Sequence, residues 1–146
     1  MKVISNSPEA TEEIGFKIGE KLRAGDIVRL YGSLGAGKTT LVKGIARALG
    51  IDRKDITSAS FTIIAEYPTI PPFFHIDLYR TSGGVDLEST GIWDCIGNSS
   101  IAVIEWPEHA EGELPEDSLK ITIKVTDKDI REIIIEGRDE KYWDYL

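Results

Sequence analysis

A glycine-rich turn between an apolar segment and a helical segment constrains this chain more than any other feature. Residues 32–39 fit the pattern G-x-x-x-x-G-K-T. The apolar residues before the turn predict a strand over residues 26–31, and the helical spacing after it ends at Gly50. Glycines let successive backbone N–H groups turn inward around an anion, and the start of the helix adds unpaired donors. The turn therefore predicts a phosphate-binding loop.

The motif predicts roles for two of the side chains in the loop. Lys38 is expected to reach the outer phosphates of a nucleoside triphosphate as a point charge, and the Thr39 hydroxyl is expected to ligate Mg²⁺. A nucleoside triphosphate and Mg²⁺ are therefore the expected ligands. The residues that we expect to contact the nucleotide are Ser33, Leu34, Gly35, Ala36, Gly37, Lys38, Thr39 and Thr40.

The composition indicates a single globular domain over residues 1–146. A hydrophobic content of 41% is enough for a core. The chain has one cysteine, Cys95, so it can form neither an internal disulfide nor a cysteine metal cluster. The N-terminus becomes polar too early for a signal peptide, and no apolar run approaches the length of a membrane span. We expect a soluble, cytoplasmic protein.

The net charge of −8 comes from one segment. Residues 81–119 contain nine acidic residues and no lysine or arginine, whereas the rest of the chain holds 17 basic residues and 16 acidic ones. Such a surface disfavours direct binding of RNA or DNA, which depends on neutralising phosphates with basic side chains. The segment is either a solubilising face or a docking surface for a basic partner.

The remaining pattern predicts an α/β fold with no repeat or linker. Ser7 and Pro8 begin a helix that Gly25 ends, and residues 86–96 are expected to be helical. Strands are expected over residues 2–5, 62–67, 73–77 and 101–106, and a hairpin joins 119–126 to 130–136. We therefore predict a P-loop NTPase-like sandwich, whose mixed sheet has a parallel centre and antiparallel edge strands. The ligand should lie beyond the carboxyl ends of the parallel strands.

Two carboxylates terminate apolar strands and are candidates for the metal. Glu105 follows four apolar residues, and Asp77 ends the less apolar segment 73–77. A phosphate loop needs at least one carboxylate to position Mg²⁺, so at least one of these two should serve it, and either is a candidate ligand. His75 is better explained as a packed or hydrogen-bonded strand residue than as a general base, because phosphoryl transfer of this type depends on positioning and electrostatics.

Two further polar features follow the loop. Arg80 comes three residues after Asp77 and could neutralise charge on the terminal phosphate, or it could form a surface ion pair. Residues 57–62 are rich in hydroxyl groups and occupy the place of a nucleotide-sensing loop, although an ordinary turn would have the same composition.

The motifs together resemble a known family. Residues 35–40 (GAGKTT), 75–80 (HIDLYR) and 105–108 (EWPE) match, in order and spacing, the bacterial TsaE family of ATPases in tRNA threonylcarbamoyladenosine biosynthesis. The similarity spans most of the chain. It implies an ATPase that works with TsaB-like and TsaD-like partner proteins, so that contact with tRNA is indirect.

The resemblance also implies roles for individual residues. Lys38 binds phosphate, Thr39 and Glu105 serve Mg²⁺, Asp77 belongs to the second acidic motif, and Trp106 lies either at the functional face or buried at the strand end. One departure stands out: where the family commonly has Ser-Pro-Thr-Phe, residues 58–61 read Ser-Ala-Ser-Phe. Ser60 keeps the hydroxyl, and we still expect it near the terminal phosphate. The catalytic set is therefore Lys38, Asp77, Glu105 and Ser60.

Two other function classes remain open. A small-molecule kinase could use the same scaffold, although residues 81–119 lack the basic residues of a phosphate-covering lid. A nucleotide-gated interaction module without catalysis would differ only in whether hydrolysis matters. A GTPase is disfavoured because the chain has no Asn-Lys-x-Asp motif for guanine. Only Arg80 is placed to act in cis, so we predict weak ATPase activity without partners.

Overall fold

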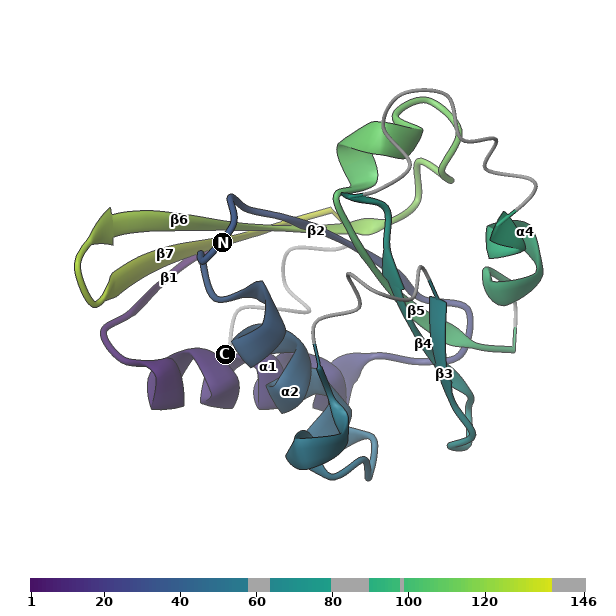
Figure 1. The fold of residues 1–146 in the computed structure, drawn as a ribbon, viewed down its shortest axis with the longest axis horizontal. Coiled ribbons are helices and arrows are strands. Elements are labelled where there is room, and N and C mark those ends of the chain that lie inside the picture. The colour runs from purple at the N-terminus through teal and green to yellow at the C-terminus, as the bar shows by residue number, and fades with distance from the viewer. Residues whose placement is uncertain (58–63, 80–89, 98, 138–146) are drawn as a thin grey trace.

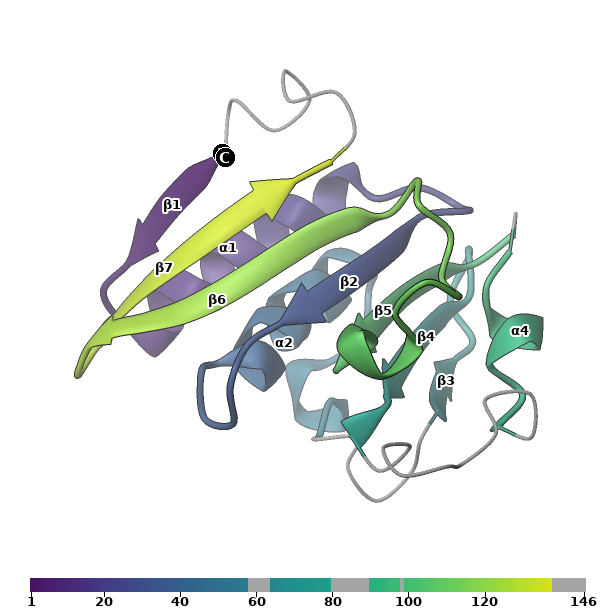
Figure 2. The same cartoon turned by 90° about the horizontal axis from the view of Figure 1, so that it is seen from above.

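The fold is built on one twisted sheet. The computed structural model describes residues 1–57, 64–79, 90–97 and 99–137. Its seven strands run in the order β1-β7-β6-β2-β5-β4-β3 (Figures 1 and 2). Their bounds are β1 (Lys2–Ser5), β2 (Ile27–Tyr31), β3 (Ile64–Tyr67), β4 (Phe73–Asp77), β5 (Ile101–Glu105), β6 (Leu119–Asp127) and β7 (Ile130–Glu136).

The centre of the sheet is parallel and its edges are antiparallel. β2 pairs in parallel with both β5 and β6, and β5 pairs in parallel with β4. The pairs β6–β7, β1–β7 and β3–β4 are antiparallel. This arrangement confirms the predicted mixed sheet. It also brings the carboxyl ends of β2, β4 and β5 to the same edge.

Two long helices cover one face of the sheet. They are α1 (Pro8–Lys21) and α2 (Lys38–Ala48), and both lie behind the sheet in Figure 2. As predicted, Ser7 caps α1: its Oγ accepts the Ala10 N–H at 3.0 Å, and Pro8 occupies the first turn, where its missing N–H costs nothing. Between these helices and the sheet lies the larger core cluster, which includes Ile18, Leu30 and Leu41.

A smaller core lies on the opposite face, beside β4 and β5. There the short helix α4 (Ile92–Cys95) and the 3-10 helix η4 (Pro107–Ala110) pack against Ile76 and Ile104. A further 3-10 turn, η1 (Arg53–Asp55), follows α2. No helix among the described residues is long and apolar enough to cross a membrane.

Glycines let α1 and α2 approach closely. A Cβ at Gly44 of α2 would lie 1.9 Å from the Glu12 carbonyl oxygen, and one at Gly15 of α1 would lie 2.2 Å from that of Leu41. Real Cβ atoms do not approach backbone oxygens so closely, so only glycine permits this crossing. The crossing sets where α2, and therefore the phosphate loop at its N-terminus, lies against the sheet.

Several predicted boundaries were wrong by a few residues. α1 ends at Lys21, before Gly25. β2 begins at Ile27, and the Asp26 amide just before it donates to the Arg23 carbonyl at 3.0 Å. β6 continues to Asp127 through a register shift, so the hairpin turn has only two residues. Of the predicted helix over 86–96, residues 86–89 lie outside the described residues and the helix covers Ile92–Cys95. Residues 62 and 63 of the predicted strand 62–67 also lie outside.

Candidate functional site: a phosphate loop facing two strand-end carboxylates

The loop between β2 and α2 has the backbone conformation that its glycines predict. Gly35 and Gly37 have φ angles of 78° and 104°, in the left-handed region that side chains disfavour. Gly37 is the N-cap of α2, and its carbonyl accepts the Leu41 N–H at 3.0 Å. The first turn of α2 therefore points its unpaired amides into the space beyond the strands.

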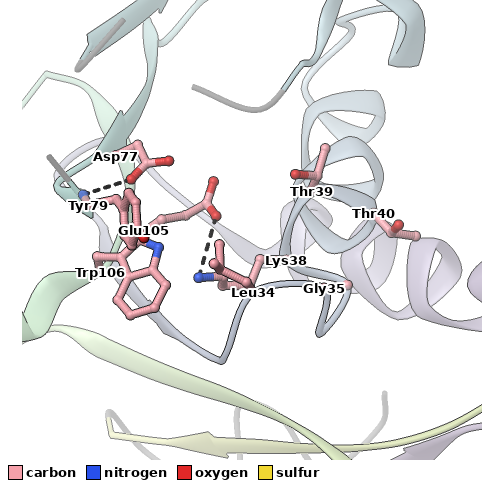
Figure 3. Close-up of a pocket in the computed structure, with 10 residues that line it drawn as sticks. Leu34, Gly35, Lys38, Thr39, Thr40, Asp77, Tyr79, Glu105 and Trp106 are labelled. Atoms are coloured by element: carbon pink, nitrogen blue, oxygen red, sulfur yellow. Dashed lines mark hydrogen bonds and ion pairs between the residues drawn. The ribbon is translucent and has the colours of Figure 1, made fainter. Parts of the chain in front are cut away.

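A cavity of about 580 Å³ lies at this edge of the sheet (Figure 3). The phosphate loop and the start of α2 form one wall, and residues at the ends of β4 and β5 form the other. Its lining residues are Leu34, Gly35, Gly37, Lys38, Thr39, Thr40, Asp77, Tyr79, Glu105 and Trp106.

Lys38 places a buried charge at the cavity wall. The side chain is only 6% exposed, and its Nζ has no hydrogen-bond partner among the described residues. Among the described residues, the nearest anionic atom is Oε1 of Glu105, at 4.0 Å. Burial lowers the pKa of Lys38, although the carboxylates of Glu105, Asp77 and Glu108 oppose the change. The oxygens of an incoming phosphate would accept hydrogen bonds from this ammonium group and would offset the cost of burying its charge.

Asp77 and Glu105 lie opposite each other on β4 and β5. Both are buried, and Asp77 Oδ1 accepts the Tyr79 N–H at 2.9 Å. Burial raises the pKa of Asp77; the Tyr79 hydrogen bond opposes the rise, whereas the neighbouring Glu105 carboxylate adds to it. Two buried carboxylates side by side favour the arrival of a cation between them and the loop.

His75 contacts Glu105 from within the sheet. The imidazole is fully buried, and its Nε2 bonds to Oε2 of Glu105. This is the packed, hydrogen-bonded residue that the sequence indicated. The sequence did not reveal the partner, because the two residues are 30 positions apart.

Trp106 is the first residue after β5. The predicted strand over residues 101–106 was therefore one residue too long. Trp106 is the one described non-glycine residue with a positive φ, at 55°. Its ring packs 5.0 Å from that of Tyr79 and 5.9 Å from that of His109, measured between centroids. The Lys38 Nζ lies 4.1 Å from the Trp106 ring centroid. Trp106 thus lines the cavity, and its role in function stays a prediction.

The donor set fits Mg²⁺. No group of three or more His, Cys, Asp or Glu gathers as a metal site within the described residues. The cavity instead offers the Asp77 and Glu105 carboxylates and, across from them on α2, the Thr39 hydroxyl (Figure 3). Mg²⁺ prefers oxygen ligands, keeps several waters and completes its shell with phosphate oxygens, so few protein ligands are needed.

Arg131 is a residue of the site that the sequence did not predict. Its Nε donates to the Ala36 carbonyl at 2.9 Å, and this bond ties β7 to the phosphate loop across 95 positions. Beside it is a second cavity of about 170 Å³, which shares Gly35, Gly37 and Thr40 with the first and is also lined by Ser7, Pro8, Thr11, Asp129 and Arg131. No local motif distinguishes Arg131 from an ordinary strand arginine.

Most of the predicted site residues converge. Nine of the ten residues that line the cavity were named as site residues from sequence, namely Leu34, Gly35, Gly37, Lys38, Thr39, Thr40, Asp77, Glu105 and Trp106. Tyr79 was not predicted as a site residue. Ser33 and Ala36 belong to the loop but do not line this cavity; Ala36 is buried, and its amide donates to the Ser33 carbonyl at 3.1 Å. Ser60 and Arg80 lie outside the described residues.

The sheet order, the loop and the facing carboxylates define the chain as an α/β protein with a phosphate-binding loop. Comparison with known families narrows this class. The family described as "Threonylcarbamoyl adenosine biosynthesis protein TsaE" matches residues 5–133. The chain belongs to the TsaE family.

Individual relatives agree with this assignment. The chain is 38% identical to the tRNA threonylcarbamoyladenosine biosynthesis protein TsaE of Treponema pallidum, over 92% of this chain and 99% of the relative. It is 39% identical to the protein of that name from Streptomyces coelicolor, over 89% and 92%. Among solved structures, Bacillus subtilis YdiB superposes with a TM-score of 0.75 at 35% identity, covering 98% of this chain and 88% of that one.

Proposed function

We propose that the chain is a Mg²⁺-dependent ATPase that serves as an accessory subunit in the biosynthesis of tRNA threonylcarbamoyladenosine. The observation that carries the enzymatic part is the Lys38 ammonium group, which is buried at the cavity with no hydrogen-bond partner among the described residues and faces two buried carboxylates. The names of the relatives carry the pathway.

In this proposal the loop amides and Lys38 hold the β- and γ-phosphates, and Lys38 exchanges its contact with Trp106 for phosphate oxygens. Thr39 and one or both of Glu105 and Asp77 hold the metal. Bound Mg²⁺ would neutralise charge that develops on the phosphates during transfer. The carboxylates at the strand ends also orient the attacking water, and Ser60 and Arg80 remain candidates for contact with the terminal phosphate.

The second cavity suits the nucleoside end of ATP. It shares Gly35, Gly37 and Thr40 with the larger cavity and is not lined by Asp77 or Glu105, so we place the nucleoside there and the phosphates in the larger cavity. Its wall includes the Thr11 side chain, which is buried and bonded to Ser5.

Two measurements test the ATPase. Calorimetric titration of the wild type with Mg·ATP and Mg·ADP should show binding, and Lys38→Ala and Glu105→Ala should each lower the release of inorganic phosphate by about 100-fold or more, since each loses stabilisation of the transition state. Wild-type rates in both variants would refute the site. Phosphate appearing on a metabolite and not in solution would favour the kinase.

The partners are tested separately. TsaB-like and TsaD-like proteins should retain the chain in a pull-down more strongly with Mg·ATP than without it, and should raise its phosphate release. Equal support of the complex by a non-hydrolysable analogue over many turnovers would favour the nucleotide-gated module without catalysis.

A further inference from the structure

The contact between His75 and Glu105 gives each oxygen of the carboxylate a separate neighbour. Oε2 of Glu105 bonds to Nε2 of His75, while Oε1 is the atom that lies 4.0 Å from the Lys38 Nζ. Glu105 is therefore held between a residue inside the sheet and the lysine of the phosphate loop, with one oxygen turned to each.

Strand pairing explains why this orientation needs a dedicated contact. In the β4–β5 register, Glu105 lies opposite Asp77, and His75 lies opposite Val103. His75 thus reaches Glu105 diagonally, over two residues on the same face of the sheet. A glutamate side chain can adopt several rotamers, and the partner of Glu105 on β4 is another carboxylate, which repels it. The imidazole supplies the attraction that selects one orientation.

The imidazole is poorly explained by packing alone. It is fully buried, and its Nδ1 has no hydrogen-bond partner within the part of the chain that the structure describes. If Nε2 carries the proton and donates it to Glu105, Nδ1 is left as an acceptor without a donor, which costs stability. An apolar side chain at this position would avoid that cost.

We infer that His75 is a positioning residue that fixes the Glu105 carboxylate, with Oε1 directed to the cavity in the place from which it can serve the metal. His75 itself touches neither nucleotide nor metal. The inference rests on the proposed function. It predicts that His75 raises the affinity of the site for Mg²⁺ and has little effect on the affinity for ATP in the absence of the metal. Losing a residue that orients a metal ligand typically costs about 10- to 100-fold in metal affinity.

The test measures ATP affinity by calorimetry over a series of Mg²⁺ concentrations and in EDTA. His75→Leu removes the donor, and His75→Asn keeps a polar side chain too short to reach Glu105. His75→Gln places an amide N–H near the position of Nε2. Phe74→Leu is the matched control, since Phe74 is the neighbour on β4 and packs into the smaller core on the opposite face. Thermal unfolding of each variant checks its fold.

The Mg²⁺ concentration that gives half of the increase in ATP affinity should rise about 10-fold or more in His75→Leu and His75→Asn. It should stay near the wild-type value in His75→Gln and Phe74→Leu, and ATP affinity in EDTA should change little in all four. If His75→Leu does not fold, the contrast between Asn and Gln decides.

Equal Mg²⁺ dependence in Asn, Gln and wild type would overturn the inference, as would an equal shift in Phe74→Leu. Absence of ATP binding by the wild type, with and without Mg²⁺, would instead refute the proposed function itself.

Discussion

The ammonium group of Lys38 lies 4.1 Å from the centroid of the Trp106 ring, although the two residues come from opposite walls of the cavity. Lys38 begins α2, and Trp106 follows β5 in a left-handed conformation. The indole face stabilises the cation, by about 0.5–2 kcal/mol in contacts of this kind. The lysine that is expected to bind phosphate thus has an aromatic contact before any nucleotide arrives.

This contact predicts an optical signal. When Mg·ATP binds, Lys38 should leave the Trp106 ring for phosphate oxygens, so the tryptophan emission should change. Trp106→Phe should lose most of the change, whereas Trp93→Phe, at an exposed position in α4, should keep it. Steady-state fluorescence alongside calorimetry measures both. Binding by calorimetry with unchanged emission in the wild type would contradict the exchange of contacts.

We predict that Asp77 makes the stability of the folded protein depend on pH. Burial raises the folded-state pKa of Asp77 above its unfolded value, so between the two values the folded state binds more protons and stability falls as pH rises. Asp77→Asn removes this loss and keeps the oxygen that accepts the Tyr79 N–H. In EDTA, its Tm should exceed that of the wild type at neutral pH, and the gain should vanish below about pH 4.

Asp94→Asn is the control for this measurement, because Asp94 is exposed on α4. It should show no such gain. A gain in Asp77→Asn that persists unchanged under acidic conditions would mean that the charge of Asp77 is not its source.

We predict that the phosphate loop needs Arg131 of β7 to stay in its binding conformation. Arg131→Leu removes the bond from Nε to the Ala36 carbonyl, and bonds from charged donors are worth about 1.5–3 kcal/mol. Without it, part of the binding energy is spent on ordering the loop, so Mg·ATP affinity should fall about 10-fold or more by calorimetry. Lys128→Ala, in the exposed turn of the same hairpin, should bind normally. Equal affinities in all three proteins would exclude this role.

The crossing of α1 and α2 predicts a severe effect of a small substitution. Gly44→Ala introduces a Cβ that would lie 1.9 Å from the Glu12 carbonyl oxygen, and backbone must move to admit it. We expect a loss of about 3 kcal/mol in the free energy of unfolding, measured with urea. Gly97→Ala, where a Cβ meets no atom of the described residues within 4 Å, should change stability by less than about 0.5 kcal/mol. Similar effects of the two substitutions would contradict the close crossing.

The sequence was sufficient for features that depend on local order along the chain. The loop at residues 32–39 needs glycine where φ is positive, and its lysine and threonine occupy fixed places at the start of a helix, so the motif carried its own geometry. The apolar runs before Asp77 and Glu105 likewise indicated strands that end in an acid. Together with the late hairpin, these patterns predicted the parallel centre and the antiparallel edges of the sheet.

Only the tertiary structure decided which distant side chains meet. The bonds of Glu105 with His75 and of Arg131 with the Ala36 carbonyl join residues 30 and 95 positions apart, and the contact of Lys38 with Trp106 crosses from helix to strand end. Strand order and register place these groups within reach, and both follow from packing of the whole sheet against α1 and α2. Local sequence patterns do not predict this packing, because the packing brings together side chains that are far apart in the chain.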